Sequence, residues 1–177
     1  MNSPFIFAII RVHMNEFSVN DKVMHFREGL SVIVDKKEMN GVDYFLVHVE
    51  REGGEIVYVP TSSAEKIIRH IISKKEAEQL IEYIITIEPE YITNTKQRRD
   101  NFKRRLGSGD IKDIAYLARQ LFFFLHPETI EVPVKFGPAD IDMLKYAHRT
   151  LLDELALSYR MSREAIESYF EKKISRC

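Results

Sequence analysis

Residues 22–60, KVMHFREGLSVIVDKKEMNGVDYFLVHVEREGGEIVYVP, decide the fold of the first part of the chain. The β-branched and aromatic residues partly alternate with polar ones, which is typical of short strands. Strands are expected at Lys22–Phe26, Leu30–Met39, Tyr44–Glu50 and Glu55–Val59. Asn40-Gly41 and Gly53-Gly54 separate the later strands and tolerate the positive φ of tight hairpin turns. Four or five such strands predict a small, strongly bent β-barrel.

The residues after Pro60 show the period of helices instead. Capping boxes of the form S-x-x-E begin at Ser62 and at Ser73, and each can start a helix. Further helices are expected at Thr95–Leu106, at Ile111–Leu125, from Pro138 to about Tyr159 and from Ser162 to about Ile174. The sequence thus predicts an α+β protein of two domains. A small SH3-like β-barrel spans residues 15–61, and an all-α domain of about five helices spans residues 62–177.

The composition excludes several classes of protein. The chain has 177 residues, 45% of them hydrophobic, with only 7 Gly and 6 Pro, which excludes a disordered or fibrous chain. With 26 Lys+Arg against 27 Asp+Glu the net charge is −1, so a uniformly basic DNA coat is excluded. The one cysteine, Cys177, permits no internal disulfide and fits a reducing cytoplasm, where we expect the protein to work.

The apolar run Pro4–Ile10 is much shorter than the ~20 residues that span a bilayer, and it lacks the flanks of a signal peptide. We expect no membrane partner. Two interpretations of this run stay open. It adds a strand to a sheet edge, or the natural start is Met14 and residues 1–13 are dispensable.

The charges are unevenly distributed along the chain. Residues 1–63 carry 6 basic and 9 acidic side chains, a net of −3. Residues 95–105 (TKQRRDNFKRR) carry six cations against Asp100 alone, a net of +5. On a helix these cations cover most of the circumference, while Phe102 and Leu106 supply a narrow anchoring face. The helix is therefore expected to protrude with its charges in solvent, either as an ordinary solvated surface or as a phosphate-contacting one.

No catalytic constellation is present in the sequence. The six histidines are scattered without metal-ligand spacing, and Gly107-Ser108-Gly109-Asp110 lacks the lysine and preceding strand of a P-loop. Asp153 and Glu154 are adjacent on a helix and point about 100° apart, which disfavours acid–base pairing. We expect a non-enzymatic protein without a metal, cofactor or small-molecule substrate.

An ordered set of short motifs resembles the CarD/CdnL family of bacterial transcription regulators, whose N-terminal module is shared with transcription-repair coupling factors. The set runs from about Phe17 to Ile174. It comprises FSVNDKV at 17–23, Val59-Pro60 with Ala64-Glu65 and Arg69, SKKEAE at 73–78, Asn94 with Arg98, Ser108-Gly109-Asp110 with Leu121, and LLDELA at 151–156. The family has a tryptophan at the position of Thr95, and threonine neither stacks nor wedges comparably, so the chain resembles a divergent member.

The resemblance implies a Tudor-like barrel that docks on the β subunit of RNA polymerase and a helical domain that contacts promoter DNA. The polymerase-contacting positions of the family fall near Lys37 and Tyr58. The expected DNA-binding residues are Thr95, Lys96, Arg98, Arg99, Lys103 and Arg104. Contact with double-stranded DNA is expected at the backbone or minor groove, weak and largely independent of sequence.

The sequence therefore predicts a cytoplasmic bacterial regulator that binds RNA polymerase and modulates open-complex stability. The alternative is a protein-interaction module that binds polymerase or another partner without touching DNA. Thr95 favours this alternative.

Overall fold

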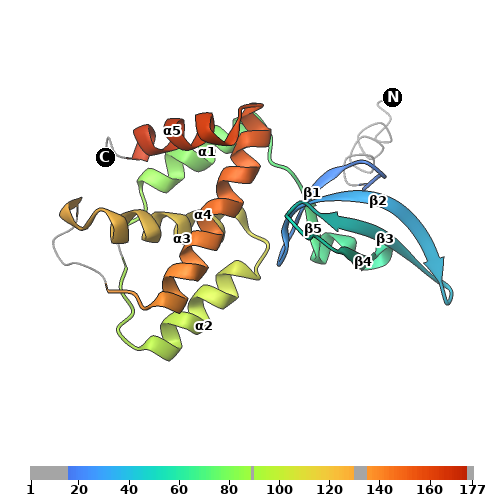
Figure 1. Cartoon of the computed structure of the whole chain (residues 1–177), viewed down its shortest axis with the longest axis horizontal. Coiled ribbons are helices and arrows are strands. Elements are labelled where there is room, and N and C mark those ends of the chain that lie inside the picture. Colours follow the sequence, from blue (N-terminus) through green and yellow to red (C-terminus); the bar gives the residue numbers. More distant parts are fainter. Residues whose placement is uncertain (1–15, 89, 130–134, 175–177) are drawn as a thin grey trace, which may run out of the picture.

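The structure is a computed structural model and describes residues 16–88, 90–129 and 135–174. The apolar run Pro4–Ile10, Met14 and Cys177 lie outside these residues. An antiparallel sheet is followed by helices, as predicted, so the chain is an α+β protein with a sheet part and a helical part (Figure 1). We call residues 16–70 the sheet domain and residues 73–174 the helical domain.

The sheet domain holds five antiparallel strands in the order β4-β3-β2-β1-β5. The strands are β1 (Lys22–His25), β2 (Gly29–Met39), β3 (Val42–Val49), β4 (Ile56–Pro60) and β5 (Ile68–His70). The β2–β3 turn has Asn40 at φ 53° and Gly41 at φ 76°, as the predicted hairpin requires. An irregularity between Ile33 and Asp35 interrupts the β2–β3 register. Figure 1 shows β2 curving strongly along the sheet, which wraps around a core of Val23, Ile33, Val47, Val59 and Ile68.

Two features of the sheet domain differ from the expectation. The capping box predicted at Ser62 is not formed: a short 3-10 helix, η1 (Thr61–Lys66), follows Pro60 without a side-chain cap, and Ser63 leaves helical geometry in it at φ −131°. The chain then forms β5, a strand that the sequence does not predict and that pairs with β1. A strand of three residues is too short to show a period in the sequence, so its pairing with β1 decides its conformation.

The helical domain contains five α-helices within the described residues, in agreement with the prediction. They are α1 (Lys74–Ile85), α2 (Thr95–Leu106), α3 (Ile111–Leu125), α4 (Pro138–Tyr159) and α5 (Arg163–Ile174). The capping box at Ser73 is formed, because the Ser73 hydroxyl accepts from the Glu76 amide and the Glu76 carboxylate accepts from the Ser73 amide. Leu117, Leu144, Leu151, Leu155 and Phe170 lie at the centre of one continuous core.

The run Leu121–Leu125 at the end of α3 belongs mostly to this core. Leu121, Phe122 and Phe123 are buried, and Leu125 alone is well exposed, at 57%. A short 3-10 helix, η2 (Pro127–Thr129), follows α3.

The long helix α4 passes through the middle of the helical domain and reaches the sheet domain. It packs mainly against α3 and also contacts α1, α2 and α5, with a further contact to β2. Figure 1 shows α2 at the lower edge of the helical domain, with its C-terminal end toward the sheet. No helix of the described residues is both long and apolar enough to cross a bilayer.

Candidate functional site

The basic helix α2 has two different faces. Arg98 and Phe102 are buried on the inner face, at 4% and 3% exposure. Lys96, Lys103 and Arg104 are exposed on the outer face. The expectation that all the cations of this helix lie in solvent is therefore wrong for Arg98. The charge on α2 is divided between a packed side and a solvent side.

Arg98 is buried because a carboxylate on α4 pairs with it. Asp140 is fully buried, and its Oδ2 accepts from Arg98 Nη2 at 2.7 Å and from Arg98 Nε at 3.2 Å. The other terminal nitrogen of Arg98 donates to the Ile92 carbonyl at 2.7 Å, which fixes the chain before α2. The guanidinium also lies 5.2 Å from the Tyr91 ring centroid and 5.8 Å from that of Phe136. Arg98 is a structural residue of the helical domain.

Arg99 shares the same carboxylate but remains half-exposed. Its Nε donates to Asp140 Oδ1 at 3.2 Å, and its side chain is 42% exposed. Asp140 also accepts from the Gly137 amide at 3.0 Å. Burial raises the pKa of Asp140, but hydrogen bonds from Arg98, from the Gly137 amide and from Arg99 outweigh it and hold the pKa below its usual value. Two guanidiniums and one ionised carboxylate leave this cluster with a positive charge of one.

The exposed cations of α2 have no comparable partner. Lys96, Lys103 and Arg104 make no ion pair or side-chain hydrogen bond with any other described residue. Arg105, on the inner side, pairs with Asp113 of α3 and lies 3.9 Å from the Tyr116 ring centroid. We call Lys96, Arg99, Lys103 and Arg104 the basic face. Such a row of long cationic side chains on a rigid helix suits phosphate contact.

Thr95 lies exposed at the first position of α2, next to the basic face. Asn94 caps the helix, because its Oδ1 accepts from the Gln97 amide at 3.0 Å. The position where the family has a tryptophan is therefore solvent-accessible and lies at a helix start. In this chain the position holds Thr95, which has a small hydroxyl-bearing side chain and no aromatic ring.

The second predicted site lies on the outer face of the sheet. Lys37 of β2 is paired in register with Tyr44 of β3, and Tyr58 of β4 is paired with Leu46. Side chains alternate along strands, so Lys37, Tyr44 and Tyr58 share one face. Tyr44 and Tyr58 meet edge to face at 6.3 Å, and Tyr58 is 47% exposed. The structure brings the two predicted polymerase-binding residues onto one surface and adds Tyr44, which strand alternation could have revealed.

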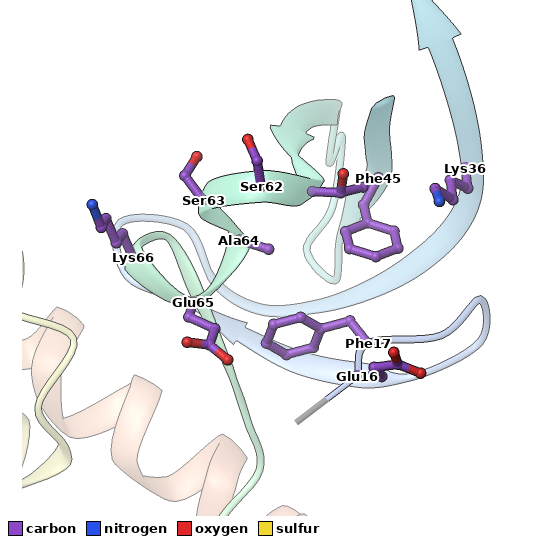
Figure 2. A pocket seen from close by; sticks show the side chains of 10 residues that line it. Glu16, Phe17, Lys36, Phe45, Ser62, Ser63, Ala64, Glu65 and Lys66 are labelled. Atoms are coloured by element: carbon purple, nitrogen blue, oxygen red, sulfur yellow. The ribbon is translucent and has the colours of Figure 1, made fainter. Parts of the chain in front are cut away.

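A cavity of about 630 Å³ opens on the other side of the sheet domain, beside η1 (Figure 2). Phe17 and Phe45 meet edge to face at 6.2 Å and line the cavity together with Ala64. Figure 2 shows Lys36, Lys66, Glu16 and Glu65 around the rim, so both signs of charge border the opening.

No cluster of three or more His, Cys, Asp or Glu side chains among the described residues has a geometry that could hold a metal ion. His25 is buried, and its Nδ1 accepts from the amides of Arg27 at 3.2 Å and Glu28 at 3.1 Å. Burial lowers the pKa of His25. This histidine therefore acts as the neutral cap of the β1–β2 turn.

Sequence reasoning misses the partners of two motif arginines. Asp140 holds Arg98, and its only signal is an acidic residue in the first turn of a helix that begins at Pro138. Glu154 holds Arg69, a pairing that neither the place of Glu154 in the LLDELA motif nor its adjacency to Asp153 predicts. Ion pairs between residues so distant in sequence leave no local pattern.

Residues 79–171 match the family model described as the CarD C-terminal domain. No curated protein matches the chain. The matched segment runs from within α1 to within α5 and includes all of α2. It covers 93 of the 177 residues, more than half of the chain. Members of this family are non-enzymatic transcription factors that interact with RNA polymerase and DNA. Together with the preceding sheet domain and the ordered motifs, the match shows that this chain belongs to the CarD family of transcription regulators.

Proposed function

We propose that this protein binds the β subunit of RNA polymerase through Lys37, Tyr44 and Tyr58 and contacts promoter DNA through the basic face of α2. It thereby modulates the stability of the open promoter complex in the bacterial cytoplasm. The sheet domain takes the role of the Tudor-like module. The DNA contact is to the backbone or minor groove and is largely independent of sequence.

The observation that carries this proposal is the division of α2 into two faces. Arg98 and Arg105 have acidic partners, whereas Lys96, Lys103 and Arg104 point to solvent without a partner among the described residues. Charges that the fold does not use remain available to a polyanion. Arg98, although expected from the sequence among the DNA-binding residues, supports the helix from beneath.

Differential binding is the physical mechanism of such a regulator. A protein that grips polymerase and open promoter DNA together favours the open state by its extra affinity for that state. Docking on polymerase raises the effective concentration of α2 near the DNA, so a few phosphate contacts suffice. A chain with a net charge of −1 can therefore act on DNA.

The salt dependence of DNA binding tests the basic face. Lys103→Gln with Arg104→Gln should weaken binding to a promoter fragment and reduce the slope of log K against log salt by about 1.8, or ~0.9 for each lost phosphate contact. The matched control is Lys75→Gln with Lys172→Gln, which removes two exposed cations from α1 and α5. Arg98 is unsuitable for this test, because its removal disturbs the packing of α2.

An unchanged affinity and an unchanged slope in the Lys103/Arg104 variant would exclude this face as the DNA contact. An equal loss in the control variant would show that only net charge matters. In either case binding to polymerase, measured separately, decides whether the sheet domain acts as proposed.

The second candidate function is a polymerase-binding module that makes no DNA contact. Thr95 favours it, because an exposed threonine cannot insert between bases at the edge of a melted region. This function predicts that the Lys103/Arg104 variant keeps both polymerase binding and regulatory effect. It also predicts that wild-type protein does not extend the promoter footprint.

A further inference from the structure

We propose that Arg69 and Glu154 are positioning residues that fix the sheet domain against the helical domain and thereby set where α2 lies relative to the polymerase-binding face. This inference rests on the proposed function for its regulatory consequence. Its structural part, a fixed orientation of the two domains, does not depend on polymerase or DNA.

The first step is the ion pair itself. Arg69 lies in β5, the last strand of the sheet, and Glu154 lies in α4, 85 residues later. Arg69 Nη2 donates to Glu154 Oε2 at 2.8 Å, and Nη1 donates to Oε1 in a parallel bond. The Glu154 side chain is fully buried, and that of Arg69 is 23% exposed. A two-bond contact between a planar guanidinium and a carboxylate restricts rotation as well as separation.

The second step is that the same two side chains fasten the connecting segment and the end of α2. Glu154 Oε1 also accepts from the Ile72 amide at 3.0 Å, and Ser158 donates to the Ile72 carbonyl at 2.8 Å. Arg69 Nε donates to the Gly109 carbonyl at 3.0 Å. Gly109 belongs to the turn that directly follows α2. The pair therefore joins the sheet, the connection and the turn after the basic helix at one point.

The third step is that neighbouring contacts fit this arrangement closely. A Cβ on Gly109 would lie 2.5 Å from the Phe26 ring, so the turn after α2 packs directly on the β1–β2 turn. The Tyr146 hydroxyl of α4 donates to the Arg27 carbonyl at 2.7 Å. The space between these groups is a cavity of only about 20 Å³. The contact between Gly109 and Phe26 is therefore tight, although open cavities of about 410 Å³ beside Arg69 and about 320 Å³ beside Tyr146 flank it.

This junction gives a structural role to residues from three of the motifs that resemble the CarD/CdnL family. Arg69, the glycine of Ser108-Gly109-Asp110 and the glutamate of LLDELA come from three separate motifs and meet in one set of hydrogen bonds. None of the three touches the proposed polymerase-binding or DNA-binding surface. What they share is control of the relative position of those surfaces.

The test measures domain orientation directly and then its consequence. In a Cys177→Ser background, spin labels on Glu52→Cys in the sheet domain and Glu82→Cys in α1 report the interdomain distance. The junction variants are Arg69→Gln, Glu154→Gln and the milder Tyr146→Phe. The control is Arg163→Gln, which removes an ion pair to Asp153 that lies within the helical domain. Circular dichroism confirms that each variant is folded.

We expect one narrow distance distribution for wild type and Arg163→Gln, and a broader or shifted one for Arg69→Gln and Glu154→Gln. Separate binding to polymerase should be retained in these variants, while the gain in open-complex lifetime should fall by about fivefold or more, the lower range of coupling between sites. Arg69→Lys keeps the charge but loses the paired bonds and should give an intermediate result.

An unchanged distance distribution in folded Arg69→Gln would overturn the inference. A broadened distribution with an unchanged open-complex lifetime would also overturn it, because orientation would then carry no function. If Glu154→Gln does not fold, the distance distributions of Arg69→Gln and Tyr146→Phe test the inference instead. Failure of wild-type protein to bind polymerase would reject the proposed function instead, and the distance measurement would still decide whether the pair fixes the orientation.

Discussion

Single side chains determine which charges on the basic helix remain free. Asp140 is buried and accepts from Arg98, Arg99 and the Gly137 amide. One carboxylate therefore holds α2 against α4 and removes Arg98 from the solvent face. A count of charges along the sequence overestimates the cations available to a ligand.

Asp140→Asn should destabilise the protein by about 3–5 kcal/mol, because it leaves the buried Arg98 guanidinium without a counter-charge. Urea denaturation at neutral pH measures this change. Asp142→Asn, at an exposed position two residues later, is the control and should change the free energy of unfolding by less than about 0.5 kcal/mol.

The same variant predicts a change in acid stability. The folded-state pKa of Asp140 is lowered, so its stabilisation is present above the unfolded-state pKa of ~3.9 and is lost as pH falls through the lower folded-state value. Asp140→Asn should therefore lose less stability than wild type on acidification below about pH 4. An equal loss in both proteins would contradict this role of Asp140.

His25 is expected to cause a second dependence of stability on pH, because it is buried in its neutral form, whereas Asp140 is buried in its charged form. Burial lowers the pKa of His25, although nearby Glu28 opposes this, and its Nδ1 must stay unprotonated to accept two amides. The unfolded chain binds a proton near pH ~6.5, so stability should fall as pH drops from above that value toward the lower folded-state pKa.

His25→Asn should flatten this dependence, measured as the change in unfolding free energy between about pH 7.5 and 5.5. Burial also lowers the pKa of His148, so a part of the slope should remain in the variant. His148→Asn alone, which leaves the β1–β2 turn intact, is the matched comparison.

At the scale of elements, two features restrict which residues the turn between α2 and α3 tolerates at position 109: the backbone conformation and the nearby Phe26 ring. Gly109 has φ +75°, which disfavours any side chain, and faces Phe26 at close range. Gly41 has almost the same φ, +76°, but a Cβ added there would meet no atom within 4 Å.

Gly109→Ala should therefore destabilise more than Gly41→Ala. Both variants share the backbone cost of roughly 1–2 kcal/mol, and only the first adds the collision with Phe26. Chemical denaturation of the two variants gives the difference. Equal losses would mean that the Phe26 ring moves aside freely.

Strand and helix positions are predictable where a period is long or a turn is chemically specific. Asn40-Gly41 and the capping box at Ser73 form as expected. β5 escapes prediction because three residues carry no period, and the burial of Arg98 escapes it because Asp140 is 42 residues away in sequence. The high positive charge of α2 is predictable from composition, but which of its cations lie on the inner side and which form the basic face depends on tertiary packing.

At the scale of the whole molecule, the two proposed binding surfaces lie on different domains. Tyr58→Ala with Lys37→Ala should reduce binding to polymerase and leave the salt slope of DNA binding unchanged, because neither residue is on α2. Pull-down of polymerase and a DNA shift assay measure the two effects. Glu52→Ala with Glu55→Ala, at exposed positions in and next to the β3–β4 turn, is the control.

A loss of DNA binding in the Tyr58/Lys37 variant without polymerase present would contradict this separation. Equal polymerase binding in variant and control would place the polymerase contact on another face of the sheet. The cavity beside Phe17 and Phe45 would then be the next surface to test.

Helix α4 acts as a lever between the two domains. Asp140, in the first turn of α4, pairs with Arg98 of α2. Glu154, 14 residues later and about 21 Å along the axis of α4, pairs with Arg69 of the sheet. A tilt of about 10° at the sheet end moves the other end by almost 4 Å, close to the ~3.4 Å rise per nucleotide along the axis of a DNA duplex. Under the proposed function, a looser Arg69–Glu154 pair would therefore shift the basic face along the DNA by about one nucleotide step.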